Sequence, residues 1–183
     1  MKKFLIMAAM VLSSVGAFAQ AEEGTLTLQP KIGLNVSNAG DQDWKANFAV
    51  GAELQYQVTN KFGLAGGVLY SVQGYKGKSV TVNGLEIKAT DWTPSYLNIP
   101  LTANYYVAKG LAIKAGVQPG IILDKDHGDN VKTFDLSIPV GLSYEFSNFV
   151  FDARYNIGVT KVADNYDGYN NVLQITFGYK FKL

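Results

Sequence analysis

Hydrophobic and polar residues alternate strictly along the last eleven residues of the chain, residues 173–183. Every odd-numbered position in this stretch is aliphatic or aromatic, and every even-numbered position is polar, basic or glycine. A period of two residues predicts a β-strand, because successive side chains of a strand point to opposite faces of a sheet. One face of this strand is wholly apolar, so we expect it to lie against an apolar surrounding, such as the lipid around a transmembrane barrel.

The same alternation recurs in seven runs upstream. No residue on the apolar face of any run is charged, although 17% of the chain is Asp, Glu, Lys or Arg. The pattern predicts an all-β fold, an eight-stranded antiparallel up-and-down transmembrane β-barrel in which the last strand pairs with the first. The predicted strands are residues 26–36, 46–58, 62–72, 97–107, 111–123, 134–146, 149–159 and 173–183.

The predicted connections alternate between short and long. Residues 59–61, 108–110 and 147–148 make tight turns, whereas 37–45, 73–96, 124–133 and 160–172 are long and polar. Short periplasmic turns and longer external loops are typical of outer-membrane barrels. Aromatic residues near the short turns fit an interfacial girdle: Tyr56, Phe62, Tyr105, Phe146, Phe149, Tyr179 and Phe181. Alternation alone would also suit a periplasmic lipocalin-like carrier, whose apolar face points inward.

The first 19 residues have the pattern of a secretory signal peptide. Lys2 and Lys3 precede an apolar run, and Ala17-Phe18-Ala19 follows it, so we expect cleavage after Ala19 or, as a second choice, after Ala21. The apolar run is short for a membrane anchor and ends in small residues. Residues 20–183 then form a single outer-membrane β-barrel domain of an exported protein in a Gram-negative bacterium.

Composition excludes several classes of function. The net charge is +1, and about −1 once the two lysines of the signal peptide are removed, and neither value indicates nucleic acid or an anionic surface as a partner. The absence of cysteine excludes disulfides and thiolate metal sites. Nothing in the sequence indicates a cofactor. The partners we expect are outer-membrane lipid and lipopolysaccharide, the barrel assembly machinery through the C-terminal strand, and an extracellular ligand or protein.

Several segments resemble a known family. Residues 96–101 (YLNIPL), 134–146 (FDLSIPVGLSYEF), 152–158 (DARYNIG) and the ending GYKF at 178–181 are similar to small outer-membrane β-barrel proteins of Bacteroidetes, described as porin-like or related to the gliding and secretion barrel PorT. The resemblance covers essentially all of residues 20–183. It implies an eight-stranded membrane barrel and brings no catalytic residues.

The polar faces of the predicted strands carry acidic and basic residues in similar numbers. Side chains fill the interior of an eight-stranded barrel, so these charges should pair across strands. We expect a structural charge network in the lumen, and the alternative is a narrow ion path or a proton-linked site. The residues concerned are Lys31, Glu53, Lys114, Asp135, Glu145, Asp152, Arg154 and Lys180.

Two long loops are candidates for external binding. Asn83-Gly84, flanked by alternating residues, predicts a hairpin that carries the third and fourth strands beyond the membrane as a ribbon. Its edge could be offered to a ligand, a host protein or a neighbouring barrel, or it could be a plain surface loop. The second loop holds Asp124, Asp126 and Asp129, which suit at most a weak external divalent site because an EF-hand glutamate is missing.

Catalysis has little support in the sequence. His127, the only histidine, could serve an outer-membrane protease or lipase dyad, but no partner serine is specified by spacing and a solvated turn explains it as well. Trp44 and Trp92 are interpreted as interfacial anchors. We therefore expect a non-enzymatic barrel with a structural, surface-binding or adhesion role through its external loops. A narrow small-solute channel is the alternative, and a lipocalin-like carrier is a further one.

Overall fold

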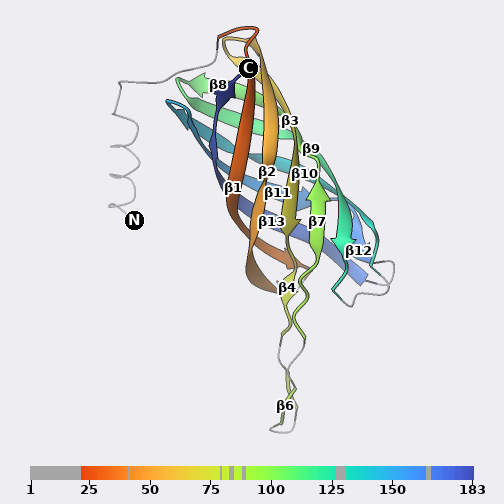
Figure 1. Cartoon of the computed structure of the whole chain (residues 1–183). Coiled ribbons are helices and arrows are strands. Elements are labelled where there is room, and N and C mark those ends of the chain that lie inside the picture. Colours follow the sequence, from red (N-terminus) through yellow and green to blue (C-terminus); the bar gives the residue numbers. More distant parts are fainter. Residues whose placement is uncertain are drawn as a thin grey trace, which may run out of the picture.

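Eight long strands form the walls of one antiparallel barrel in the computed structural model of the chain (Figure 1). The structure describes residues 22–40, 42–78, 80–82, 85–87, 90–126, 131–163 and 166–183. The predicted signal peptide with both cleavage sites, Asn83, Gly84, His127 and Asp129 lie outside these residues. The walls are β1 (Leu26–Ala39), β2 (Asp43–Thr59), β3 (Phe62–Val72), β7 (Ser95–Asn98) with β8 (Leu101–Ala108), β9 (Leu111–Asp124), β10 (Phe134–Phe146), β11 (Phe149–Gly158), and β13 (Tyr166–Tyr179) with β14 (Phe181–Lys182).

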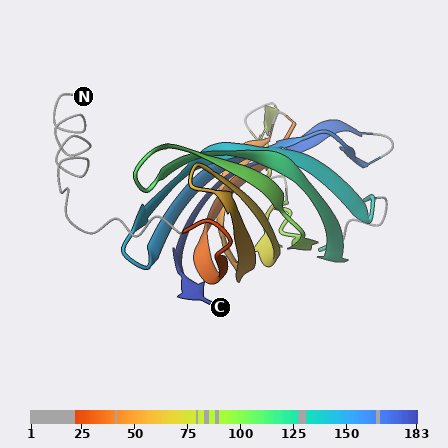
Figure 2. The same ribbon diagram turned by 90° about the horizontal axis from the view of Figure 1, so that it is seen from above.

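The last strand closes the barrel against the first. β1 pairs with β2 on one side and with β13 on the other, where Ile32 lies opposite Phe177. Figure 2 shows the C-terminal strand beside β1 when the molecule is seen from above. Closure leaves no unpaired edge among the long strands, because every wall hydrogen-bonds to two neighbours. The predicted eight-stranded antiparallel barrel is confirmed.

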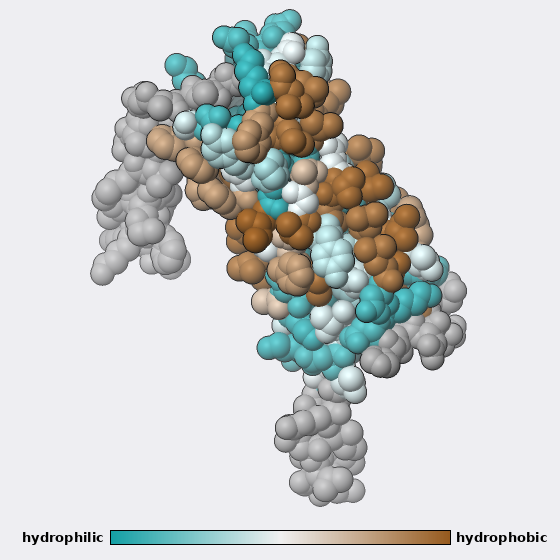
Figure 3. All heavy atoms as spheres, in the orientation of Figure 1, coloured by the Kyte–Doolittle hydropathy of each residue, from teal (hydrophilic) through white to brown (hydrophobic). Residues whose placement is uncertain are grey.

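Apolar side chains face outward and polar side chains face inward. Ile32 and Leu34 are each 63% exposed, whereas Lys31 and Asn35 on the same strand are 3% and 0% exposed. Figure 3 shows a brown apolar band between teal polar ends. The lipocalin-like alternative required the opposite orientation and is wrong. Among the described residues, no helix is both long and apolar enough to cross a membrane.

The two ends of the barrel differ as the sequence predicts. Two-residue turns at 60–61, 109–110 and 147–148 lie at what we call the short-turn end, with the C-terminus. The other end, the long-loop end, carries β4 (Tyr75–Lys76), β5 (Val80–Val82), β6 (Leu85–Ile87) and β12 (Lys161–Ala163). The girdle residues predicted at the short-turn end are exposed or half-exposed, and Phe149 stacks on Phe177 with ring centroids 5.5 Å apart.

Five strands extend beyond their predicted limits toward the long loops, and β1, β2 and β13 extend furthest. β1 reaches Ala39, β2 begins at Asp43 and β13 begins at Tyr166, while β4 pairs with β2 and β12 pairs with β13. Backbone hydrogen bonds continue here although side chains no longer alternate in hydropathy, since no lipid face requires the pattern. The periodicity therefore underestimates these strands.

Two predicted strands are each divided in two. The fourth is broken at Ile99-Pro100 into β7 and β8, because proline has no N–H to give to the ladder. The eighth is broken at Lys180, whose backbone N–H bonds to Asn148 in the neighbouring turn. Each pair of pieces still occupies one place in the wall, since β7 and β8 both lie between β3 and β9.

Candidate functional site

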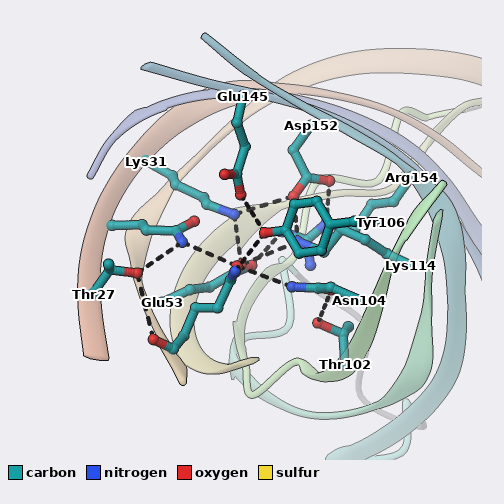
Figure 4. Close-up of polar contacts among 12 residues, drawn as sticks. Thr27, Lys31, Glu53, Thr102, Asn104, Tyr106, Lys114, Glu145, Asp152 and Arg154 are labelled. Carbon is teal, nitrogen blue, oxygen red and sulfur yellow. Dashed lines mark hydrogen bonds and ion pairs between the residues drawn. The ribbon is translucent and has the colours of Figure 1, made fainter. Parts of the chain in front are cut away.

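A cluster of five buried charged side chains crosses the middle of the lumen, and we call it the central ion cluster. It consists of Lys31, Glu53, Lys114, Asp152 and Arg154, which project from β1, β2, β9 and β11 toward one another (Figure 4). Lys31 Nζ lies 2.5 Å from Glu53 Oε2 and 3.1 Å from Asp152 Oδ2. Lys114 Nζ lies 2.5 Å from Asp152 Oδ2 and 3.4 Å from Glu53 Oε2, and Arg154 Nη2 lies 2.5 Å from Glu53 Oε1.

Glycines on the neighbouring strands leave room for these long side chains. Gly67 lies opposite Glu53, and a Cβ at Gly67 would come 2.6 Å from Glu53 Cγ. Gly141 lies opposite Arg154, and a Cβ there would come 2.2 Å from the carbonyl oxygen of Ala153. Both distances are far below van der Waals contact. The strands can therefore approach this closely around the cluster only because these positions lack a side chain.

A second network, the short-turn network, fills the lumen on the short-turn side of the cluster. Tyr106 donates its hydroxyl hydrogen to Glu145 Oε1 at 2.7 Å, and Lys180 donates to Glu145 Oε2 at 2.7 Å. Gln55 donates to the Tyr106 hydroxyl at 2.7 Å, which joins the network to β2. Gln55 Oε1 in turn accepts hydrogen bonds from Gln29 and Asn104.

The structure thus divides the eight predicted lumen charges into three groups. Five form the central ion cluster, and Glu145 with Lys180 belongs to the short-turn network. Asp135 stands apart toward the long-loop end, where its Oδ1 accepts a hydrogen bond from Thr160 at 2.8 Å. Lys182, near the end of the chain, is outside the lumen with its side chain 68% exposed.

Apolar residues from all four long loops meet across the long-loop end, and we call this group the loop cap. Its buried members are 0–8% exposed, and the indole N–H of Trp92 donates to the Lys125 carbonyl oxygen at 2.7 Å. The interpretation of Trp92 as an interfacial anchor is therefore wrong, whereas Trp44 is 45% exposed on the surface. The members of the loop cap are Ala39, Tyr75, Trp92, Val131 and Val162.

The aspartates predicted as a weak metal site have other roles where the structure describes them. Asp126 Oδ2 accepts a hydrogen bond from the Thr93 backbone N–H at 2.7 Å, and Asp124 Oδ1 accepts one from the Asp126 N–H at 3.0 Å. The bond to Thr93 fastens one long loop to another, and the bond between Asp124 and Asp126 lies within a single loop. The described residues contain no group of three or more acidic, His or Cys side chains placed to hold a metal ion.

A polar contact outside the membrane joins β2 to the segment before β7. Lys45 Nζ donates to Thr93 Oγ1 at 2.6 Å and to Asp91 Oδ2 at 3.1 Å. The hydrogen bond from Lys45, together with a second from the Gly77 backbone N–H, lowers the pKa of the Asp91 carboxyl below its ordinary value. This contact helps to hold the root of the longest loop against the barrel.

The predicted hairpin around Asn83-Gly84 is present to the extent that the structure describes it. β5 and β6 pair antiparallel, with Thr81 opposite Glu86, and they form a two-stranded sheet separate from the barrel. Figure 1 places β6 far beyond the long-loop end. The ribbon therefore extends away from the membrane band.

Comparison with known proteins identifies the family. The family model described as "Outer membrane protein beta-barrel domain" matches residues 18–164. The chain belongs to this family. An outer-membrane location follows for the barrel, so the short-turn end faces the periplasm and the long-loop end faces the exterior. The matched residues end before β13, the strand that closes this outer-membrane barrel against β1.

Solved structures of outer-membrane proteins have the same fold. Neisserial surface protein A is 18% identical with a TM-score of 0.53, and the match covers 87% of this chain and 100% of that one. The attachment invasion locus protein Ail of Yersinia pestis is 16% identical with a TM-score of 0.52, covering 87% and 99%. OprG of Pseudomonas aeruginosa is 16% identical with a TM-score of 0.51, covering 90% and 99%. No curated protein matches the sequence.

Sequence reasoning missed two parts of the site. Tyr106 has the same parity as Thr102 and Asn104, so the alternation could have identified it as a buried phenol in the short-turn network. The loop cap gives no such signal, because Trp92 and Val162 lie where periodicity ends. The contact between these residues depends on the tertiary arrangement of four separate loops over the long-loop end of the lumen.

Proposed function

We propose that this outer-membrane barrel is a non-enzymatic surface protein that binds an extracellular ligand or protein through its long loops, while the barrel anchors it. The observation that carries the proposal is that side chains obstruct the lumen at three successive levels. These are the short-turn network, the central ion cluster and the loop cap. Bound partners would include outer-membrane lipid and lipopolysaccharide around the apolar band, and the assembly machinery at the C-terminal strand.

The ribbon of β5 and β6 is the surface we propose for binding. Among the described residues the two strands pair only with each other, so each has a free edge. An isolated two-stranded ribbon is marginally stable in water, and a free edge can accept an added strand from a partner. Adhesion fits this arrangement. Ail, which shares the fold, carries attachment in its name, but at 16% identity that likeness extends to fold alone.

We also propose that the chain is one of the small Bacteroidetes barrels related to PorT. The segments YLNIPL at 96–101 and DARYNIG at 152–158 support this origin. The first segment spans the end of β7 and the start of β8, and the second lies in β11, so both are part of the barrel wall.

An attachment assay tests the binding proposal. Cells that display the wild-type protein should adhere to host-cell monolayers or to one another more than cells displaying a variant in which residues 79–89 are replaced by a short Gly-Ser linker. Lys109→Ser, in a periplasmic turn, is the matched control and should adhere like the wild type. If the linker variant and the wild type attach equally at equal surface levels, the ribbon of β5 and β6 is not the binding surface.

A further inference from the structure

The central ion cluster has an excess of one positive charge. It contains three basic side chains and two carboxylates, and all five side chains are at most 4% exposed. A buried net charge is costly unless an opposite charge accompanies it. The protein's remaining lumen carboxylates do not fill this role. Glu145 is engaged by Lys180 at 2.7 Å, and Asp135 lies six residues along β10 from Gly141, about 20 Å at roughly 3.3 Å per residue.

The excess charge coincides with hydrogen-bond donors that have no partner. Arg154 Nη1 makes no hydrogen bond, and Nε only faces Asp152 Oδ1, at 3.7 Å. Asn156 follows two residues along the same inward face of β11, is 1% exposed, and leaves both its amide nitrogen and oxygen without partners. Buried polar groups in native proteins are normally satisfied, so these side chains indicate a bound species that supplies acceptors.

Among the described residues, the lumen atoms without a hydrogen-bond partner lie on one side of the short-turn network. The unpartnered atoms on the barrel walls lie level with the central ion cluster or between it and the long-loop end. They belong to residues that include Asn98, Gln118 and Gln174. None of the atoms without a partner belongs to a described residue of the short-turn network. Figure 4 shows the residues of the short-turn network and of the central ion cluster projecting into the same lumen. The unsatisfied groups therefore mark a candidate site at Arg154 and on its exterior side.

We propose that Arg154 and Asn156 bind one small monovalent anion that neutralises the central ion cluster. Water could satisfy the free N–H groups, but it would leave the buried charge unbalanced. A single negative charge accepts from Arg154 Nη1 and Asn156 Nδ2 and balances the charge in one step. The narrow interior restricts the occupant to a halide-sized or similarly small ion. The site is independent of the surface-binding role proposed for the loops.

Unfolding of the detergent-refolded barrel in chloride and in gluconate, at equal ionic strength, tests the proposal. Gluconate is too large for the narrow lumen. Chloride should stabilise the wild type with saturation, and at tenfold the dissociation constant the folded-to-unfolded ratio should rise about elevenfold. Equal stability in the two salts would overturn the proposal, as expected if water fills the site or one lysine lacks its proton.

Two isosteric variants separate this site from a general salt effect. Asn156→Asp supplies the missing negative charge, so the barrel should be as stable in gluconate as in chloride. Asn104→Asp places the same group in the short-turn network, where Asn104 donates to Gln55, and it should keep the elevenfold response. A chloride response that persists in Asn156→Asp would contradict the assignment. Crystals grown in bromide should give an anomalous peak within hydrogen-bond distance of Arg154 Nη1, and a peak elsewhere or none would also overturn it.

Discussion

Replacing Glu53 with glutamine should destabilise the barrel more than any other neutral substitution in the lumen. Glu53 contacts all three basic side chains of the central ion cluster, with Lys31 and Arg154 each at 2.5 Å and Lys114 at 3.4 Å. Glu53→Gln keeps the size of the side chain but raises the buried excess from one positive charge to two. Removing one partner of a buried ion pair costs about 3–5 kcal/mol, a large part of the roughly 5–15 kcal/mol that stabilises a typical protein.

The double variant Lys31→Met/Glu53→Gln provides the decisive comparison. It removes one positive and one negative charge, so the cluster keeps the net charge of the wild type. We expect it to be more stable than Glu53→Gln, with a coupling free energy of about 0.5–3 kcal/mol between the two sites. Urea unfolding in detergent micelles, followed by the mobility difference between folded and boiled barrel on gels, measures the free energy of unfolding for each variant.

Two results would refute this reasoning. One is a Glu53→Gln barrel that unfolds at the wild-type urea concentration, and the other is a double variant whose loss equals the sum of the two single losses. Asp91→Asn is the control, because its carboxylate is half-exposed and pairs with Lys45 outside the lumen. It should shift the unfolding transition of the barrel far less than Glu53→Gln does.

Three further predictions concern other parts of the molecule. Gly141→Ala should lower the free energy of unfolding by about 1–3 kcal/mol, because the new methyl group would overlap the neighbouring strand; unchanged urea unfolding would be inconsistent with the close approach. Trp92→Ala should open the loop cap and speed protease cleavage of the long loops, whereas exposed Trp44→Ala should not, and equal cleavage rates would count against the cap. NMR titration should give Asp91 a pKa below the roughly 3.9 of a free aspartate, and Lys45→Met should raise it. The stability that this contact contributes is present above the ordinary pKa of aspartate, and it is lost as the pH falls through the lower pKa that Asp91 has in the folded protein. If the pKa of Asp91 does not change in Lys45→Met, Lys45 is not the cause of the shift.

The membrane-facing part of the fold follows from sequence because lipid imposes a rule on every second residue. β3 and β10 match their predicted limits, since alternation begins and ends with the strand in both. Beyond the membrane no lipid contacts the strands, so apolar and polar residues need not alternate there. β13 therefore begins seven residues before its predicted start, and β12 had no periodic signal to announce it.

The lumen was predictable in composition and only partly in arrangement. Parity alone puts Lys31, Glu53 and Arg154 inside, but it cannot assign partners, because these depend on strand stagger around the whole barrel. The register of β11 against β10 sets Arg154 beside Gly141 and thereby allows its side chain to reach Glu53 across the lumen. The loop cap needed the tertiary structure, since Trp92 lies in a segment with neither strand periodicity nor a turn motif.

Single-channel recording of the wild-type barrel in planar lipid bilayers tests the central claim most directly. The short-turn network, the central ion cluster and the loop cap obstruct the lumen at three levels, and we propose that the barrel serves as an anchor for its long loops. The account predicts that correctly folded protein, verified by its heat-dependent gel mobility, gives no stable unitary conductance. Reproducible unitary openings from the same folded preparation would contradict the account and favour the narrow small-solute channel.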